Sequence, residues 1–256
     1  MRSFSDADAY THALTTENEL VAAEQRNAGS PAARTLLPSG ASVRQALGAG
    51  ALSDPDFDRL YPEKIQVASW RFWTPIHVAY RAAEVLESLG AARVLDVGSG
   101  PGKFCIIGGM VAPNVTFVGV EHRGHLVATA REVASRLDVS NVHFAVGDAT
   151  AAALNRFDAY YLYNPFGENL FQREDWLDAD VELSFRRYVH DRHRMRAALA
   201  QARVGTIVIT YHGPGMTMPS GYERLFADPI GSDSLCVWQK KRAGATAGSH
   251  PLRGKS

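Results

Sequence analysis

Apolar runs with the length of strands alternate with helical stretches through the middle of the chain. The runs lie at residues 92–97, 115–121, 142–148, 157–164 and 205–212, and helical stretches follow most of them. Strands that alternate with helices predict a parallel sheet with helices on both of its faces. The fold class expected is therefore α/β, with a Rossmann-like parallel sheet.

The two ends of the chain depart from this alternation. Residues 221–228 and 232–239 are strand-like runs around Pro229-Ile230-Gly231, which predicts an antiparallel hairpin at the edge of the sheet. Helix signals at residues 15–29 and short helical pieces after them predict a helical amino-terminal extension, or cap, over residues 1–74. Residues 75–241 would form the main domain, and the polar residues 242–256 are expected to be a disordered tail.

The composition excludes several classes of protein. The chain has 256 residues, is 46% hydrophobic and carries a formal net charge of zero, so it can bury a large core and has no general attraction to nucleic acid or to an anionic membrane. Its two cysteines provide neither a disulfide framework nor metal-ligand spacing, and no metal site is expected. There is no apolar run long enough to span a bilayer, and the first residues carry acids where a signal peptide needs apolar residues. A cytoplasmic protein is expected.

Glycines and acids gather at the carboxyl ends of the first three predicted strands. In parallel sheets, ligands bind at these ends. Three glycines that let the backbone turn tightly beside a ligand follow the first strand, at Gly98, Gly100 and Gly102, directly after Asp96. The second strand ends in Glu121, which can accept both hydroxyls of a ribose, and the third ends in Asp148, which can accept from an amino group such as that of adenine. Together they predict a nucleoside pocket.

The spacing of the glycines narrows the choice of nucleoside. A dinucleotide-binding loop reads G-x-G-x-x-G, because the pyrophosphate lies on the helix N-terminus, whereas this loop reads G-x-G-x-G. The carboxylate of Asp96 just before it would repel a pyrophosphate and attract a cationic ligand. A nicotinamide-dependent oxidoreductase is therefore the weaker alternative.

Four stretches in order resemble the motifs of class I S-adenosylmethionine-dependent methyltransferases. They are VLDVGSGPGKF, FVGVEHR, VHFAVGDAT and YLYNPFGE, each at the end of a predicted strand. The resemblance covers roughly residues 93–239, including the terminal hairpin. It implies a Rossmann-like methyltransferase with S-adenosylmethionine as its cofactor.

The resemblance also implies roles for individual residues. The three glycines would pass beneath the amino-acid part of the cofactor, and Asp96 would orient its ammonium group. Glu121 would hold the ribose, Asp148 the adenine amine, and Ala149 would line the adenine slot. The cofactor site is further expected to include Ser99, His122, Asn164 and, from a Trp73-Thr74-Pro75 segment folded over the cofactor, Thr74.

The stretch YLYNPFGENL combines a strand with an abrupt stop. Pro165 has no N–H and would interrupt a sheet ladder, so the fourth strand must end there. In the family that the motifs resemble, this strand ends beside the reactive methyl group, which implies that Asn164, Pro165 and Phe166 face the methyl acceptor. His212, after the fifth strand, could act as a base or orient the substrate. The acceptor is left open: a small molecule, or a nitrogen of protein or RNA.

Less specific interpretations of the same residues stay open. Asn164-Pro165 could merely end a strand, and Phe166 could be an ordinary core residue. The chain could also be a scaffold that binds the nucleoside and transfers nothing, which only an assay of turnover would distinguish from an enzyme.

Overall fold

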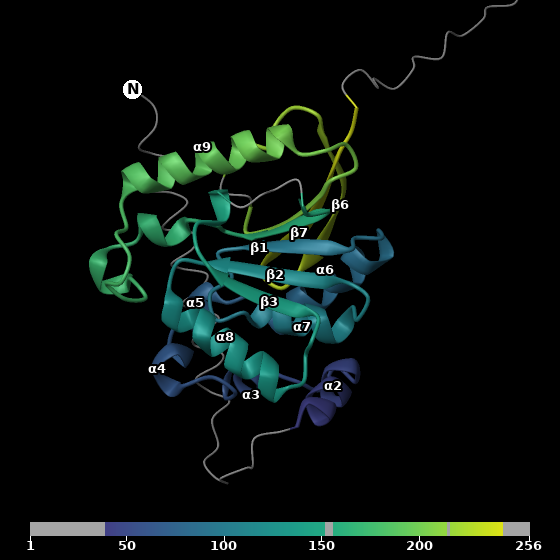
Figure 1. Cartoon of the computed structure of the whole chain (residues 1–256), viewed down its shortest axis with the longest axis vertical. Coiled ribbons are helices and arrows are strands. Elements are labelled where there is room, and N and C mark those ends of the chain that lie inside the picture. The colour runs from purple at the N-terminus through teal and green to yellow at the C-terminus, as the bar shows by residue number, and fades with distance from the viewer. Residues whose placement is uncertain (1–38, 152–155, 214–215, 243–256) are drawn as a thin grey trace, which may run out of the picture.

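A mixed sheet of seven strands forms the centre of the molecule in the computed structural model, which describes residues 39–151, 156–213 and 216–242 (Figure 1). Its strand order is β3-β2-β1-β4-β5-β7-β6. The strands are β1 Arg93–Val97, β2 Thr116–Glu121, β3 Val142–Val146, β4 Ala159–Tyr163, β5 Ile207–Tyr211, β6 Tyr222–Ile230 and β7 Asp233–Lys240. Strands β1 to β5 run parallel, as the alternation of the sequence predicts.

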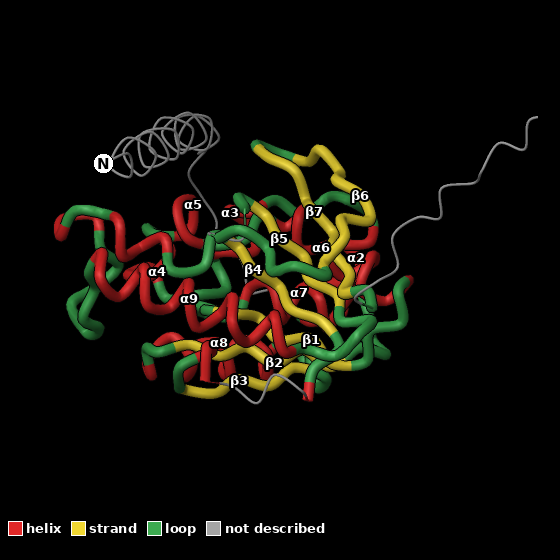
Figure 2. Tube along the Cα trace, turned by 90° about the horizontal axis from the view of Figure 1, so that it is seen from above, coloured by secondary structure: helices red, strands yellow, loops and turns green. Residues whose placement is uncertain are grey.

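The terminal hairpin is confirmed. Strand β7 pairs antiparallel with β5, and β6 forms the edge opposite β3 (Figure 2). The turn lies later than the predicted Pro229-Ile230-Gly231, because Pro229 is still within β6 and pairs with Ser234. Proline lacks a backbone N–H, and an edge strand tolerates this because its outer side has no neighbouring strand to which an N–H would donate.

Helices cover both faces of the sheet, as predicted. Helices α6 Ile76–Ser88, α7 Lys103–Val111 and α8 Gly124–Arg136 contribute to one large hydrophobic core on one face. Helix α9 Phe185–Gln201 covers the other face over a smaller core that includes Met195 and Leu199 (Figure 1). Within the part of the chain that the structure describes, no helix has the length and apolar character needed to cross a membrane.

The described amino-terminal residues pack onto the larger core. They form four short helices, α2 Gly40–Gly48, α3 Asp54–Asp58, α4 Glu63–Gln66 and α5 Ser69–Phe72. Side chains such as Leu47, Phe57 and Trp73 are buried in the same cluster as those of α6 and α7. The helix predicted at residues 15–29 and most of the predicted tail lie outside the described residues.

Among the described residues, three short 3-10 helices follow β3 and β4, whose ends lie at the pocket described below. They are η1 Ala149–Ala151, η3 Gly167–Leu170 and η4 Arg173–Asp175. The last two belong to the β4–α9 segment, residues 164–184, which joins the end of β4 to the start of α9.

Candidate active site

A pocket opens at the carboxyl ends of the parallel strands and is lined by residues at or after the ends of β1 to β5. The sequence places the nucleoside site at the ends of the first three of these strands. Nine of the predicted site residues line the pocket: Gly98, Gly100, Glu121, His122, Ala149, Asn164, Pro165, Phe166 and His212. Five others lie outside the lining: Thr74, Asp96, Ser99, Gly102 and Asp148.

The glycines of the loop after β1 have two different functions. Gly98 and Gly100 have φ angles of 74° and 52°, and nothing lies within 4 Å of where a Cβ atom would stand. Gly102 has a φ of 82°, but its Cβ atom would come within 2.6 Å of the Phe144 ring. The first two glycines therefore leave space in the pocket, while the third allows α7 to pack closely against β3.

Glu121 lies at the end of β2 with its carboxylate held from two sides. Its Oε2 atom accepts the Gly100 N–H at 3.1 Å, and its Oε1 atom accepts the Arg123 N–H at 2.9 Å. These backbone bonds orient an acid that is only 7% exposed and lines the pocket. Because each carboxylate oxygen has two acceptor positions, Glu121 can still accept from hydroxyl groups of a ligand.

Asp96 lies behind the glycine loop, 4% exposed. The pKa of Asp96 is raised to about 7. Burial is the main cause, the Cys105 thiol at 3.5 Å partly opposes it, and the nearby Glu121 adds to it. A carboxylate this poorly solvated would gain from a cation placed at the loop.

Asp148 is already engaged by two partners. Its Oδ1 atom accepts from the backbone and hydroxyl of Thr150, and its Oδ2 atom accepts from Arg194 of α9 at 2.5 Å. Burial raises the pKa of Asp148, but the bonds from Thr150 and Arg194 outweigh burial and leave it below its ordinary value. An adenine amine would therefore have to share Oδ2 with Arg194.

Two further predicted residues serve the core. The Thr74 hydroxyl accepts a hydrogen bond from the Tyr161 hydroxyl at 3.2 Å, and both side chains are buried. The Ser99 side chain lies against Gly119, whose missing Cβ atom would come within 2.6 Å of the Ser99 Oγ atom. Trp73, next to Thr74, does line the pocket.

The residues after β4 and β5 adopt an uncommon backbone conformation. Asn164, Phe166 and His212 have φ angles of 39°, 72° and 54°, and all three line the pocket. Non-glycine residues rarely occupy the left-handed region, and such residues cluster at binding sites. The Asn164 side chain also packs against Gly167, where a Cβ atom would come within 2.5 Å of its amide. The Asn164–Phe166 turn is thus a built feature of the pocket wall, which a simple strand exit does not require.

His212 is held between the pocket and the terminal hairpin. Its Nε2 atom lies 3.3 Å from the Ser232 hydroxyl, and its Nδ1 atom lies 3.4 Å from Oδ2 of Asp233. The rings of Tyr163 and Tyr211 contact the imidazole edge-on. These contacts fix the orientation of the His212 ring at the edge of the pocket.

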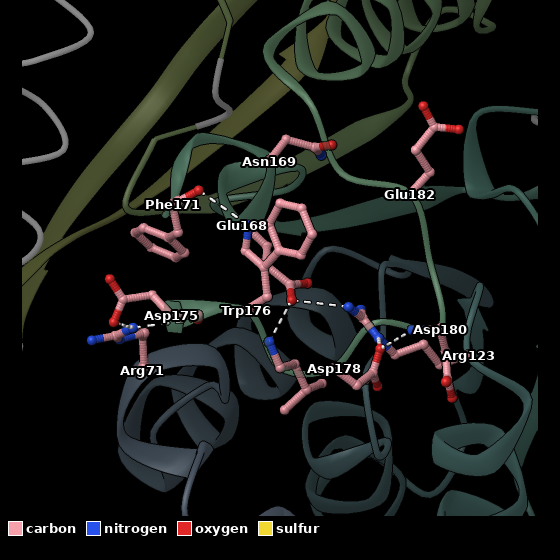
Figure 3. A network of polar contacts seen from close by, with 12 residues as sticks. Arg71, Arg123, Glu168, Asn169, Phe171, Asp175, Trp176, Asp178, Asp180 and Glu182 are labelled. Carbon is pink, nitrogen blue, oxygen red and sulfur yellow. Dashed lines mark hydrogen bonds and ion pairs between the residues drawn. The ribbon is translucent and has the colours of Figure 1, made fainter. Parts of the chain in front are cut away.

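The sequence analysis missed a buried arginine at this site. The Arg123 side chain, 6% exposed, lies 2.9 Å from Glu168 and 2.9 Å from Asp178 (Figure 3). It also lies 4.0 Å from Glu121. Burial lowers the pKa of Arg123, but Asp178 and Glu168 more than compensate and leave it raised. In the sequence, the only indication of this role is an arginine two residues after the strand-end acid Glu121. The partners of Arg123 are 45 and 55 residues away, so no local sequence pattern could pair them with it.

Aromatic side chains line the pocket beside the turn after β4. Phe72 and Phe171 meet edge to face with ring centroids 5.8 Å apart. The Arg71 guanidinium lies 5.4 Å from the Phe171 ring centroid and binds Asp175 at 2.6 Å. This side of the pocket offers apolar surface to an acceptor.

One group of metal-ligand types occurs in the described part of the chain, formed by His125, Asp178 and Asp180. Its Asp178 Oδ1 atom already accepts from the Arg123 guanidinium. Asp180 is largely exposed, with 68% of its side chain accessible. A nearby guanidinium disfavours a second cation, so this group is better described as an ion-pair network.

Comparison with known proteins shows what this fold is similar to. Residues 89–175 match a family model described as a methyltransferase domain. This part of the chain is similar to a methyltransferase domain. This agrees with the resemblance indicated by the four motifs and with the seven-strand order of the sheet.

The chain is also similar to a tRNA (guanine-N(7)-)-methyltransferase of Microcystis aeruginosa. The two are 38% identical over 69 residues, which are 27% of this chain and 33% of the relative. The chain thus spans about a third of the length of the curated relative it matches.

Solved structures resemble the chain in fold. A proposed O-methyltransferase of Klebsiella pneumoniae superposes with a TM-score of 0.52 at 17% identity, over 79% of this chain and 97% of the other. TrmN of Thermus thermophilus superposes with a TM-score of 0.50 at 19% identity, over 68% of this chain and 51% of the other. These similarities show the Rossmann-like fold that the sequence predicts.

Proposed function

We propose that this chain transfers a methyl group from S-adenosylmethionine to an acceptor bound beside the Asn164–Phe166 turn. One observation carries the proposal: the glycine loop, Glu121 and this turn, which come from three different strands, line one pocket. The matched methyltransferase domain supports the same reaction class.

The residues present fit the proposed cofactor. Gly98 and Gly100 leave open space over the loop, and Glu121 presents an oriented carboxylate for ribose hydroxyls. Asp96 would stabilise the ammonium group from behind the loop, directly or through water. Ala149 and His122 would line the adenine and ribose parts of the site, with Asp148 sharing its Oδ2 atom between Arg194 and the adenine amine.

The cofactor, when bound, supplies an electrophilic methyl group on a sulfonium sulfur. Methyl transfer is an in-line displacement, so much of the rate enhancement comes from holding the acceptor in position. The amide oxygen of Asn164 would accept an N–H of an acceptor amine, and Phe166 with the neighbouring aromatics would exclude water. His212, oriented by Asp233, would take up a proton if the acceptor must lose one.

The acceptor is proposed only as a class. The name of the Microcystis relative suggests an RNA nitrogen, whereas a small molecule fits the aromatic wall of the pocket equally well. A cytoplasmic location stays a prediction from the sequence.

The proposal is tested by calorimetric titration with S-adenosylmethionine, S-adenosylhomocysteine and NADH. Wild-type protein should bind the first two and not the third. Glu121→Gln removes the charge of the ribose-binding acid and should weaken binding by about 10- to 100-fold, since a hydrogen bond to a charged group is worth about 1.5–3 kcal/mol. Glu132→Gln, at an exposed position of α8 outside the pocket lining, is the matched control and should bind as wild type does.

Three outcomes separate the alternatives. Binding of NADH alone would favour an oxidoreductase, and binding of nothing would refute the cofactor site. Cofactor binding without release of S-adenosylhomocysteine, across a screen of transfer RNA and small amine and hydroxyl acceptors, would favour the scaffold.

A further inference from the structure

Arg123 connects the two halves of the pocket. It lies at the start of α8, two residues after the last residue of β2, and serves as the N-cap residue of that helix. Its backbone N–H donates to Glu121, the proposed ribose acid, at 2.9 Å. Its guanidinium donates in the other direction, to Glu168 through Nη2 and to Asp178 through Nε, both at 2.9 Å.

Both carboxylate partners belong to the β4–α9 segment. Glu168 lies in η3, directly after the Asn164–Phe166 turn, and its Oε1 atom also accepts the Leu177 N–H at 2.8 Å. Asp178 follows Leu177 and also accepts the Asp180 N–H at 2.9 Å. The guanidinium therefore draws together two parts of one segment that folds back on itself (Figure 3).

The burial of Arg123 makes this connection strong. Only 6% of its side chain is exposed, so water could hardly take the place of a carboxylate that the guanidinium loses. His125 adds a second contact from α8 to Asp178, at 3.5 Å, but 36% of its side chain is exposed. Arg71 binds the same segment through Asp175 from α5, and none of its contacts involves Glu121.

We infer that Arg123 is a positioning residue that couples occupancy of the cofactor site at Glu121 to the order of the β4–α9 segment on the acceptor side. The inference rests on the proposed function, because the ligand that fixes Glu121 is the cofactor. A ligand bound to the Glu121 carboxylate stabilises the Arg123 backbone, and the Arg123 side chain then holds Glu168 and Asp178 in place.

Coupling of this kind is reciprocal. If the cofactor orders the segment, then the ordered segment must raise the affinity for the cofactor by the same factor. Loss of the guanidinium should therefore weaken cofactor binding by about fivefold or more, although the side chain itself is directed at the segment.

The test is hydrogen–deuterium exchange of peptides covering residues 166–182, with and without saturating S-adenosylhomocysteine. Wild-type protein should exchange more slowly in this segment when the ligand is bound. Arg123→Gln should lose that slowing at saturation, and Arg123→Lys, which keeps the charge but not the two-sided geometry, should recover part of it.

Asp175→Asn is the matched control. This substitution breaks the ion pair between Arg71 and the same segment, and Arg71 has no contact with Glu121. Without ligand, the segment of this variant should exchange faster than that of the wild type. The ligand should still slow its exchange. If Arg123→Gln does not fold, Glu168→Gln carries the same comparison with the arginine still paired to Asp178.

Equal slowing by the ligand in wild type and Arg123→Gln would overturn the coupling, and so would an equal loss in Asp175→Asn. A failure of the proposed function looks different: the wild-type protein would then bind no S-adenosylhomocysteine in the calorimeter, before any variant is compared.

Discussion

The Nζ atom of Lys103 lies 2.7 Å from the Oδ1 atom of Asp58, joining the helix after the glycine loop to the amino-terminal helix α3. A second carboxylate, that of Asp54, lies 2.5 Å from the same nitrogen and also accepts the Ile76 N–H. Lys103 is 3% exposed. Burial raises the pKa of Asp58 more than the Lys103 ammonium lowers it, so this carboxylate depends on its partner.

Lys103→Met should therefore destabilise the fold severely, since it leaves two neighbouring carboxylates without their cation. Breaking a buried ion pair by removing one partner costs about 3–5 kcal/mol, and urea unfolding followed by circular dichroism measures it. The control is Arg59→Gln, whose ion pair with Asp56 is solvent-exposed and whose loss should cost about 0.5 kcal/mol or less. A Lys103→Met variant as stable as the control would show that the amino-terminal helices are not anchored through this pair.

Two glycines of the same loop should respond differently to alanine. Gly102→Ala forces a methyl group into the Phe144 ring at a left-handed position and should cost about 2–4 kcal/mol of unfolding free energy. Gly98→Ala meets only the left-handed penalty, about 1–2 kcal/mol, because its methyl group enters open space.

The binding of S-adenosylhomocysteine completes this comparison. Gly98→Ala should weaken it by about tenfold, as the new methyl group lies where the ligand is proposed to pass. Folded Gly102→Ala should bind nearly as wild type does. The opposite ranking in calorimetry would mean that the ligand lies on the other side of the loop.

The stability of the fold should depend on the proton of Asp96. Burial raises the pKa of this carboxyl from 3.8 to about 7 in the folded state. Between these values the folded protein holds a proton that the unfolded chain has released, so the contribution of this group is complete at low pH and is lost as the pH rises to about 7. The slope is about 1.4 kcal/mol per pH unit for one group.

Asp96→Asn removes this slope and nothing else that titrates. The free energy of unfolding of both proteins is measured by urea unfolding at about pH 5 and about pH 8. From the lower to the higher pH, it should fall more for the wild type than for Asp96→Asn. Parallel pH dependences for the two proteins would show that Asp96 is ionised throughout.

The Asn164 side chain should act on turnover and hardly on the cofactor. Asn164→Gly keeps the left-handed backbone and removes the amide, so it should lower kcat by about 100-fold with the acceptor found in the screen. Its affinity for S-adenosylhomocysteine should stay within about threefold of wild type. If the affinity for S-adenosylhomocysteine fell as much as kcat does, Asn164 would instead contact the methyl donor.

Local patterns were enough to predict the sheet and the position of the pocket. The strand runs, the glycine loop and Glu121 are each legible within a few residues, because strand period, positive φ and strand ends are properties of short stretches. Gly102 shows the limit: its spacing matches the two pocket glycines, yet its lack of a side chain serves the packing against Phe144.

The sequence by itself determined the fold class, the motif order and the edge of the sheet at which the pocket opens. Only the tertiary structure decided which charges meet there. Arg123 and Glu168 are 45 residues apart along the chain, and so are Lys103 and Asp58. Arg194 binds Asp148 although the whole of β4 lies between them in the sequence. Burial and pairing of such charges depend on how distant segments pack, because the free energy of an ion pair is set by its surroundings and not by its neighbours in the chain.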